Sequence, residues 1–347
     1  MKYILMTTII IFLLAICIIF PIVFRRNSCE SYEDKIVKNV DFPFKNIVNE
    51  NGKLMNIIAL TAPFRSKEHE DIFKSYQKKG IPILGVTSYL NFPGKIDNQF
   101  DDKYHIDHPF DYINSCIGWL YCFRDPSSRG LVNVPMLEIA ESDFYRSKLY
   151  KPNSKKKYDF IYVCLNDNKS CNIGWQSHIR KWELFKKCLP ILCEKLQLKG
   201  LLIGRTNCDY TPKCKSNLEV VDSLPYWDFI KKMSECKFLI VCSVSDPSPR
   251  IIAEAMCLNL PVLVNKNIYG GWKYINEQTG EFFNDEKDIE TQIQKLLSKL
   301  NQYQPRKYYQ SNYGPEKSGL KLKKFVKNLY PELKSCKYLL FQGSAVN

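Results

Sequence analysis

The segment 243–256, Ser-Val-Ser-Asp-Pro-Ser-Pro-Arg-Ile-Ile-Ala-Glu-Ala-Met, contains the residues best suited to chemistry. It follows an apolar strand, and Ser248 with the proline after it predicts the N-cap and first position of a helix. Such a helix start presents unpaired N–H groups and a partial positive charge, to which Arg250 adds a cation. These features favour a phosphate site, while Asp246 and Glu254 supply carboxylates that accept hydrogen bonds from sugar hydroxyls. An ordinary capped helix with a surface acid and base is the alternative.

The elements that must position these residues alternate between strands and helices. Across residues 158–303, short apolar strands are followed by segments with a helical apolar period, which predicts a parallel sheet covered by helices on both faces. Before it, Ser66 predicts the start of a helix between two apolar strands, and Gly80 predicts its end. A charged segment that contains proline, 151–157, separates the two patterns. The sequence therefore predicts an α/β protein of two lobes, over residues 53–150 and 158–303.

The two ends of the chain differ from the lobes. Residues 3–24 carry no charge and are mostly Ile, Leu, Phe or Val, a run long enough to cross a bilayer. Arginines follow at once, so we expect an uncleaved transmembrane anchor over residues 1–26; a removed signal peptide is the alternative. The polar residues 27–52 predict a stem. The tail, 304–347, is expected to be helical, and its segment 314–329 is amphipathic enough to pack back on the first lobe.

The orientation of this anchor in the membrane stays open. Four basic residues follow the apolar run and only Lys2 precedes it, which favours a cytoplasmic position for the lobes. Large domains that follow an N-terminal anchor are nevertheless often lumenal, in the Golgi or the endoplasmic reticulum. Among the 14 cysteines, Cys208 and Cys214 flank one loop and are candidates for a disulfide, but the spacing reveals no disulfide framework.

The segment 243–256 resembles the donor-binding signature of GT-B glycosyltransferases, in particular those of family 4. That signature is an acid, seven residues, Glu-Ala-Met, a short turn, and Pro-Val on a strand. This chain matches it at Asp246, Glu254-Ala255-Met256 and Pro261-Val262. Downstream, Gly270-Gly271 matches the family's paired glycines, and Thr279-Gly280 matches its later glycine before an apolar strand. Asp246 replaces the family's usual glutamate, and Asn259 replaces its turn glycine, as the side chain that best tolerates a positive φ. Exostosin-like transferases share a similar Ser-x-Arg, Glu and Pro-Val stretch and are the close alternative.

This resemblance implies a GT-B fold, in which two Rossmann-type lobes face each other across a cleft. It also implies a nucleotide-diphosphate sugar as co-substrate, no further cofactor, and transfer of the sugar with retention of configuration. Within that family pattern Glu254 would bind the ribose, and Asp246 would lie beside the transferred sugar as a catalytic residue. Gly271, one of the paired glycines, would belong to the same nucleotide-sugar site.

In the family pattern, the diphosphate meets backbone N–H groups and fixed cations. Ser248 and Ile251 would offer backbone N–H groups, and Arg250 its side chain, at the start of the predicted helix. The basic pair Arg180 and Lys181 is the candidate for the family's further diphosphate contacts, although a solvated helix face would also explain it. The chain contains no Asp-x-Asp triplet, which metal-dependent GT-A transferases normally use, so no metal is expected.

The first lobe should supply the acceptor site, and its histidines are the residues there that suggest chemistry. His108 ends the segment His-Ile-Asp-His and is a candidate catalytic base that would orient an acceptor hydroxyl. Histidine and aspartate are also metal ligands, but their spacing here matches no known metal site. A loop histidine with ordinary surface contacts is the alternative.

Composition and charge limit the class of protein and its partners. The 347 residues are 45% hydrophobic and 25% charged, which excludes disordered and fibrous classes. The net charge of +14 suits an anionic partner such as a nucleotide sugar, but the lysines are spread out, so no nucleic acid is expected. We therefore expect a membrane-anchored glycosyltransferase that acts on a hydroxyl of a glycan, lipid or protein. A catalytically inactive GT-B relative that serves as a binding or scaffold protein is the alternative, which the aspartate at position 246 keeps open.

Overall fold

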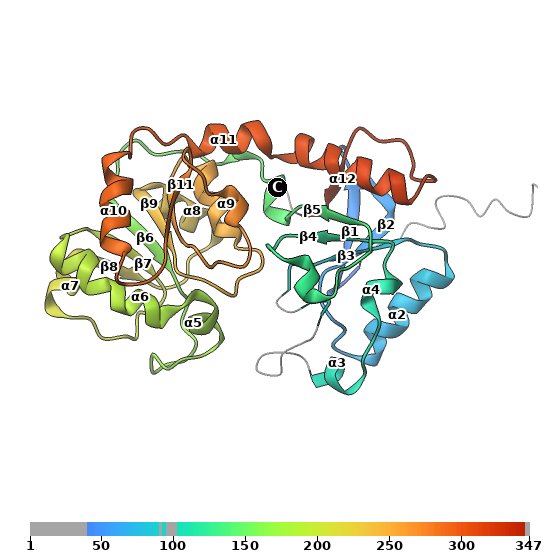
Figure 1. The fold of residues 1–347 in the computed structure, drawn as a ribbon, viewed down its shortest axis with the longest axis horizontal. Coiled ribbons are helices and arrows are strands. Elements are labelled where there is room, and N and C mark those ends of the chain that lie inside the picture. Colours follow the sequence, from blue (N-terminus) through green and yellow to red (C-terminus); the bar gives the residue numbers. More distant parts are fainter. Residues whose placement is uncertain (1–39, 90–91, 95–102, 344–347) are drawn as a thin grey trace, which may run out of the picture.

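The computed structural model describes residues 40–89, 92–94 and 103–343, which form two α/β lobes side by side (Figure 1). Each lobe contains a six-stranded sheet. The expected membrane anchor over residues 3–24 lies outside the described residues. Within the three described ranges, no helix is both long and apolar enough to span a bilayer.

The first lobe has a mixed sheet, in which β2 to β5 are parallel and β1 pairs antiparallel with both β2 and β12. Across the sheet the strands are β12 (Leu339–Phe341), β1 (Phe44–Asn49), β2 (Leu54–Leu60), β3 (Ile83–Val86), β4 (Gly118–Tyr121) and β5 (Met136–Glu138). The helices of this lobe are α2 (Lys67–Lys78), α3 (Lys103–Asp107) and α4 (Tyr112–Ser115). The predicted cap of α2 is confirmed, because the Ser66 hydroxyl accepts a hydrogen bond from the backbone N–H of His69 at 3.4 Å.

Two strands of this sheet correct the sequence prediction. β1 lies within residues 27–52, which the sequence predicts as a stem, yet Ile47 and Val48 are buried in the core of the lobe. β12 lies within the tail, which is predicted to be helical. Both strands are short, so neither shows a clear period in the sequence, and pairing in the folded sheet defines them: β1 pairs with β2 and β12, and β12 pairs with β1.

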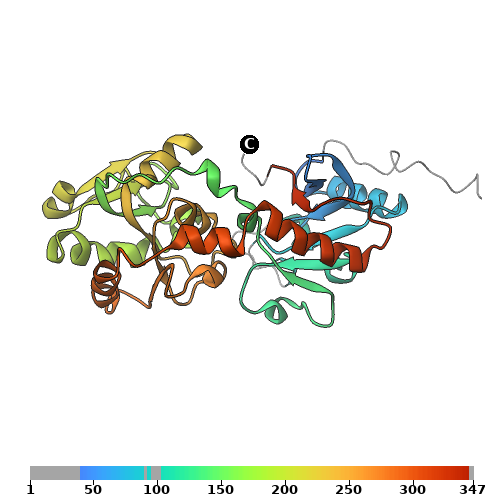
Figure 2. The same cartoon turned by 90° about the horizontal axis from the view of Figure 1, so that it is seen from above.

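The tail connects the two lobes. α11 (Pro305–Asn312) packs against α9 (Arg250–Cys257) of the second lobe, and α12 (Pro315–Leu329) runs along the first lobe, as Figure 1 and Figure 2 show. Leu322 and Val326 of α12 are fully buried in the apolar cluster that includes strand residues of the first lobe. The expectation that an amphipathic helix of the tail packs back on the first lobe is therefore confirmed.

The second lobe has the fully parallel sheet that the sequence predicts. Its strands, in order, are β11 (Gly280–Phe283), β10 (Val262–Asn265), β9 (Cys236–Val241), β6 (Tyr158–Val163), β7 (Gly200–Ile203) and β8 (Leu218–Val221). Besides α9, its helices are α5 (Trp175–Arg180), α6 (Trp182–Leu189), α7 (Pro212–Asn217), α8 (Tyr226–Ser234) and α10 (Ile289–Ser298). Neighbouring residues of β6 belong to different buried clusters, Phe160 to one and Ile161 to the other, so both faces of the sheet are covered.

Buried polar contacts hold the lobes together. Asp143, in the segment that leads from the first lobe to the second, is buried and lies 2.6 Å from Lys273 Nζ of the second lobe, whose side chain is 9% exposed. The Tyr274 hydroxyl donates to the same carboxylate. Phe123 of the first lobe also stacks on Tyr269 of the second, with ring centroids 4.7 Å apart. Because breaking a buried ion pair costs about 3–5 kcal/mol, these contacts fix how the lobes sit against each other.

Candidate active site

A cavity of about 350 Å³ lies at the carboxyl end of the parallel sheet in the second lobe. Open α/β sheets bind their ligands at this end. The ends of β6 and β9, helix α5 and the start of α9 form its walls. The residues that line it are Tyr162, Val163, Arg180, Phe229, Ile240, Val241, Cys242, Ser243, Asp246, Ser248, Arg250, Ile251 and Glu254.

The loop that precedes α9 is organised around Asp246, whose side chain is buried. Its Oδ1 accepts a hydrogen bond from the Ser248 N–H at 3.0 Å, and its Oδ2 forms an ion pair with Arg180 of α5. The predicted N-cap is wrong by one residue, because Pro249 rather than Ser248 occupies that position. Pro249 offers no side-chain cap to α9. The Ile252 N–H donates to the Pro249 carbonyl at 3.3 Å, which leaves the N–H groups of Arg250 and Ile251 for a ligand at the cavity.

The paired glycines support this loop from behind and do not line the cavity. The Gly270 N–H donates to the Asp246 carbonyl at 2.9 Å, and a Cβ at Gly270 would lie 1.8 Å from the carbonyl oxygen of Pro247. A Cβ at Gly271, which has φ of 74°, would lie 2.6 Å from the ring of Pro249. Close approach to the loop therefore requires glycine at both positions. Gly271 belongs to the site as its support, not as a surface of the cavity.

Glu254 is buried one turn into α9, with 6% of its surface exposed. Its Oε1 accepts hydrogen bonds from the hydroxyls of Tyr145, at 3.3 Å, and Tyr226, at 3.2 Å. Burial raises the pKa of this carboxyl, and the two tyrosine hydrogen bonds act in the opposite direction. Two donors on one oxygen hold the carboxylate in a fixed orientation at the cavity wall.

Glu254 and Arg250 also line a second cavity of about 350 Å³, between the lobes. The other residues around it are Lys45, Glu141, Tyr145, Tyr226, Trp227 and Gly343, which come from both lobes and the tail. Arg250 Nη2 lies 3.0 Å from Glu141 Oε2, although 59% of the arginine side chain is exposed. The start of α9 is thus the shared wall of two adjoining cavities, and Arg250 reaches from one toward the other.

Two predicted site residues lie away from these cavities. Lys181 follows α5 in a left-handed conformation, with φ of 56°, and is not part of either cavity wall. His108 follows α3 at the surface of the first lobe and stacks on Tyr104, with ring centroids 4.4 Å apart. His108 lines neither cavity, and its contacts fit the alternative of an ordinary surface histidine; its role as a base for the acceptor stays a prediction. In the described part of the chain, no group of three or more His, Cys, Asp or Glu side chains is arranged to hold a metal.

Several residues of the site carry no signal in the sequence. Glu141 and Tyr145 lie more than a hundred residues before their partners on α9, so only the tertiary structure brings them there. Tyr226 follows a proline at the start of α8, where its aromatic ring predicts packing and not a hydrogen bond to Glu254. Sequence reasoning found the acids and the cations but not the residues that orient them.

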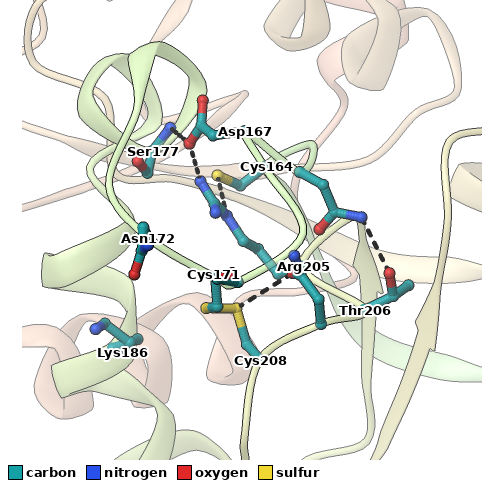
Figure 3. Close-up of a disulfide and its surroundings, with 12 residues drawn as sticks. Cys164, Asp167, Cys171, Asn172, Ser177, Lys186, Arg205, Thr206 and Cys208 are labelled. Atoms are coloured by element: carbon teal, nitrogen blue, oxygen red, sulfur yellow. Dashed lines mark hydrogen bonds and ion pairs between the residues drawn. A yellow bond between two sulfur atoms is a disulfide. The ribbon is translucent and has the colours of Figure 1, made fainter.

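The cysteines pair differently from the prediction. Cys208 is bonded to Cys171 (Figure 3). Cys214 is bonded to Cys193, so a bond between Cys208 and Cys214 is excluded. Both true partners are distant in sequence, 37 and 21 residues away, and the apolar context of Cys193 resembles that of a buried free thiol. Both disulfides lie in the second lobe, and Cys171–Cys208 includes the loop that follows β6.

No family model matches this sequence, and no curated protein sequence matches it significantly. Solved structures do match the fold. The S. aureus protein TarM has a TM-score of 0.54 and 13% identity over 79% of this chain and 54% of TarM. The pneumococcal O-GlcNAc transferase GtfA, solved with UDP and GlcNAc, has a TM-score of 0.52 and 12% identity over 79% of this chain and 56% of GtfA. Sucrose-phosphate synthase from Thermosynechococcus elongatus has a TM-score of 0.50 and 13% identity, over 74% of this chain and 71% of the synthase.

This chain therefore spans about half the length of TarM and GtfA. At these identities the likeness is one of fold, and it extends over both lobes. The architecture predicted from the sequence, two Rossmann-type lobes across a cleft, is confirmed. This chain has the GT-B fold, the two-lobed architecture of these glycosyltransferases.

Proposed function

We propose that this chain is a glycosyltransferase that takes a sugar from a nucleotide-diphosphate sugar and transfers it to a hydroxyl group. The observation that carries this proposal is that Asp246 and Glu254 line one cavity at the uncapped start of α9. In a GT-B fold, this is the wall at which strands of the second lobe end and a helix begins. An anion-binding helix start flanked by two carboxylates suits a diphosphate that joins a ribose to a sugar.

The donor would be bound by groups with separate tasks. Both tyrosines donate to Oε1 of Glu254, which leaves Oε2 as the oxygen directed to a ribose hydroxyl. The N–H groups of the first turn of α9, with Arg180 and Arg250, would bind the diphosphate. Asp246 would lie beside the transferred sugar, where it also keeps Arg180 in place through their ion pair. Lys181 has at most an indirect part.

We infer that the reaction retains configuration and needs no metal, in line with the resemblance to family 4. The bond between the sugar and the diphosphate breaks, the acceptor oxygen bonds to the same carbon from the same face, and its proton passes to the leaving diphosphate oxygen. Negative charge grows on the leaving diphosphate, and the start of α9 with two arginines can stabilise that charge in a fixed geometry. The acceptor, a hydroxyl of a glycan, lipid or protein, would approach from the side of the first lobe.

We further propose that residues 3–24 anchor the enzyme in a membrane, because this run is apolar and long enough to cross one. Deletion of residues 1–26 should move the protein from the membrane fraction to the soluble fraction without loss of the circular dichroism signal of the folded lobes. A truncated protein that still sediments with membranes after a salt wash would contradict this anchor.

The experiment that tests the activity is donor hydrolysis with a panel of UDP- and GDP-sugars, on the chain from residue 27 onward. We expect hydrolysis of one donor, and loss of that hydrolysis in Arg180→Ala. An inactive binding protein is the second candidate, favoured by the ion pairs that both arginines of the site already make with Asp246 and Glu141. Binding of a nucleotide diphosphate without any hydrolysis or transfer would support that second candidate.

A further inference from the structure

Two disulfides cross-link segments of the second lobe. The Cα atoms are 5.1 Å apart in both Cys171–Cys208 and Cys193–Cys214, a separation ordinary for disulfides. Cys171–Cys208 joins the loop after β6 to the loop after β7 (Figure 3). Cys193–Cys214 joins the segment after α6 to α7. Only the first of them lies in the loop that leads into α5, the helix that carries Arg180.

A buried ion pair lies directly beside Cys171–Cys208. Arg205, which is fully buried, donates from Nη2 to Asp167 Oδ2, and Arg205 Nε also lies 3.3 Å from Cys164 Sγ (Figure 3). Arg205 comes three residues before Cys208, and Asp167 four residues before Cys171. The covalent bond and the ion pair therefore connect the same two loops at two adjacent points.

This connection extends to the start of α5. Asp167 accepts hydrogen bonds from the backbone N–H groups of Gln176, at 2.6 Å, and Ser177, at 2.9 Å, and so caps the first turn of α5 from the loop. These hydrogen bonds fix the start of α5 to the loop after β6, while Ile179 buries the far end of this short helix. Arg180 at its end reaches Asp246 only if α5 keeps this position.

The backbone of both loops needs external support. Cys171 and Arg205 have φ of 56° and 54°, in the left-handed region that side chains other than glycine disfavour. A Cβ at Gly174 would lie 2.6 Å from Cβ of Asp167, so the loop after β6 is also folded tightly on itself. Such a conformation persists when surrounding contacts over-determine it, and here the disulfide and the ion pair supply those contacts.

We propose that Cys171–Cys208 positions Arg180 for donor binding, and that the second lobe therefore matures in an oxidising compartment. Disulfides persist in the secretory pathway and outside cells and are rare in the cytosol. Each bond forms when two thiols lose two protons and two electrons to a thiol–disulfide oxidant of that compartment. This assigns the lobes to the lumenal or extracellular side of the membrane, against the count of basic residues near the apolar run. The role of Arg180 in this inference rests on the proposed function.

The thiol state of the protein tests the compartment independently of any activity. The full chain, expressed in a eukaryotic cell, would be trapped with N-ethylmaleimide under denaturing conditions, digested without reduction and analysed by mass spectrometry. We expect peptides cross-linked through Cys171–Cys208 and through Cys193–Cys214. If a protein that had folded before denaturation yielded Cys171 and Cys208 as alkylated thiols, the assignment of the lobes to the lumenal or extracellular side would be overturned.

Donor binding tests the positioning role, with UDP and GDP as probes in titration calorimetry. The double variant Cys171→Ser with Cys208→Ser should raise the Kd of the nucleotide that binds by about fivefold or more. The matched control, Cys193→Ser with Cys214→Ser, removes a disulfide of the same lobe that does not contact the loop into α5, and should change that Kd less than twofold. Circular dichroism and the melting temperature verify that both variants are folded.

The outcomes separate this inference from the proposed function. Equal losses of affinity in the two double variants would overturn the positioning role, since they would reflect general loosening of the lobe. A parent protein that binds neither UDP nor GDP would overturn the proposed function and the positioning role together. The mass-spectrometric result would still decide the compartment in that case.

Discussion

Arg250, in the first turn of α9, forms an ion pair with Glu141 outside the second lobe, with 3.0 Å between Nη2 and Oε2. Glu141 is buried, and the same Oε2 accepts a hydrogen bond from Lys45 Nζ at 2.8 Å. A carboxylate from the segment that joins the lobes thus holds one of the cations at the proposed diphosphate site. An anionic ligand at the start of α9 must compete with Glu141 for Arg250.

Replacement of that carboxylate should strengthen the binding of an anionic ligand. Glu141→Gln removes a negative charge, and an ion pair with an exposed partner is worth about 0.2–1 kcal/mol. We therefore expect the Kd for UDP or GDP to fall by up to about fivefold in titration calorimetry. The control is Glu138→Gln. Glu138 is an exposed acid that lines neither cavity, and its Oε1 lies 3.8 Å from Lys273 Nζ. An unchanged Kd in Glu141→Gln would mean that Arg250 does not contact the nucleotide.

Replacement of Glu254 should change the pH dependence of the free energy of unfolding as well as the kinetics. Burial raises the pKa of its carboxyl above the ordinary value of 4.5, so the folded state favours the protonated form. The stability that this preference contributes is present below the unfolded pKa and is lost as pH rises through the folded pKa. As pH rises above 4.5, the free energy of unfolding of the parent should therefore fall relative to that of Glu254→Gln, as measured by urea unfolding. If the difference in free energy of unfolding between the parent and Glu254→Gln stayed constant with pH, this would contradict a raised pKa of Glu254.

The same substitution should weaken donor binding more than turnover. A ribose is bound in the ground state and in the transition state alike, so the loss of its partner should mainly raise the KM for the donor. The matched control is Tyr226→Phe, which removes one hydrogen bond to Glu254 but keeps the carboxylate and the ring. We expect a smaller rise in KM for Tyr226→Phe than for Glu254→Gln, and little change in kcat for either variant.

The second lobe was predictable because its signals are local. Its strands are short buried apolar runs, and the loop and helix from Asp246 to Glu254 follow one of them directly along the chain. A parallel sheet places the ends of its strands at one edge, so the two acids had to lie near each other. Asn259, expected in the family's glycine position, has the positive φ of 61° that this position requires.

Strands β1 and β12 of the first lobe and the partners of the acids were not predictable for the opposite reason. β1 and β12 come from opposite ends of the described chain and pair only in the folded protein. Glu141 and Tyr145 reach α9 from the segment that joins the lobes, a contact with no periodic or spacing signal. His108 has a chemically capable side chain, but a residue type alone says nothing of distance to the cavity.

Gly270 should be more sensitive to alanine than its conformation suggests. Its φ is not positive, so alanine meets no backbone penalty there, but its Cβ would lie 1.8 Å from the Pro247 carbonyl oxygen. The loop that carries Asp246 would have to move, and we expect Gly270→Ala to lower both the melting temperature and the affinity for UDP or GDP. Gly80→Ala is the comparison, since it meets open space and only the left-handed penalty of about 1–2 kcal/mol. A Gly270→Ala protein that binds nucleotide like the parent would show that the loop does not form the site.

Arg180 and Lys181 are neighbours in sequence, but their different positions predict different effects on turnover. Arg180 lines the cavity and is paired with Asp246, whereas Lys181 lies beyond the end of α5 and lines neither cavity. Removal of one fixed group that stabilises developing negative charge in a water-poor site typically costs about 2.7–4 kcal/mol. We therefore expect Arg180→Ala to lower kcat by about a hundredfold or more, and Lys181→Ala by less than about threefold.

Donor hydrolysis at saturating nucleotide sugar measures both effects, and the melting temperature reports whether each variant is folded. Arg180→Lys keeps the charge but loses the planar two-pronged donor, so it should recover part of the lost turnover. If Arg180→Ala and Lys181→Ala lose turnover equally, the diphosphate is not bound between α5 and α9. The same assay in EDTA tests whether these cations act without a metal, because turnover should then persist. Loss of activity in EDTA with recovery in Mn²⁺ would show instead that a metal neutralises the leaving diphosphate.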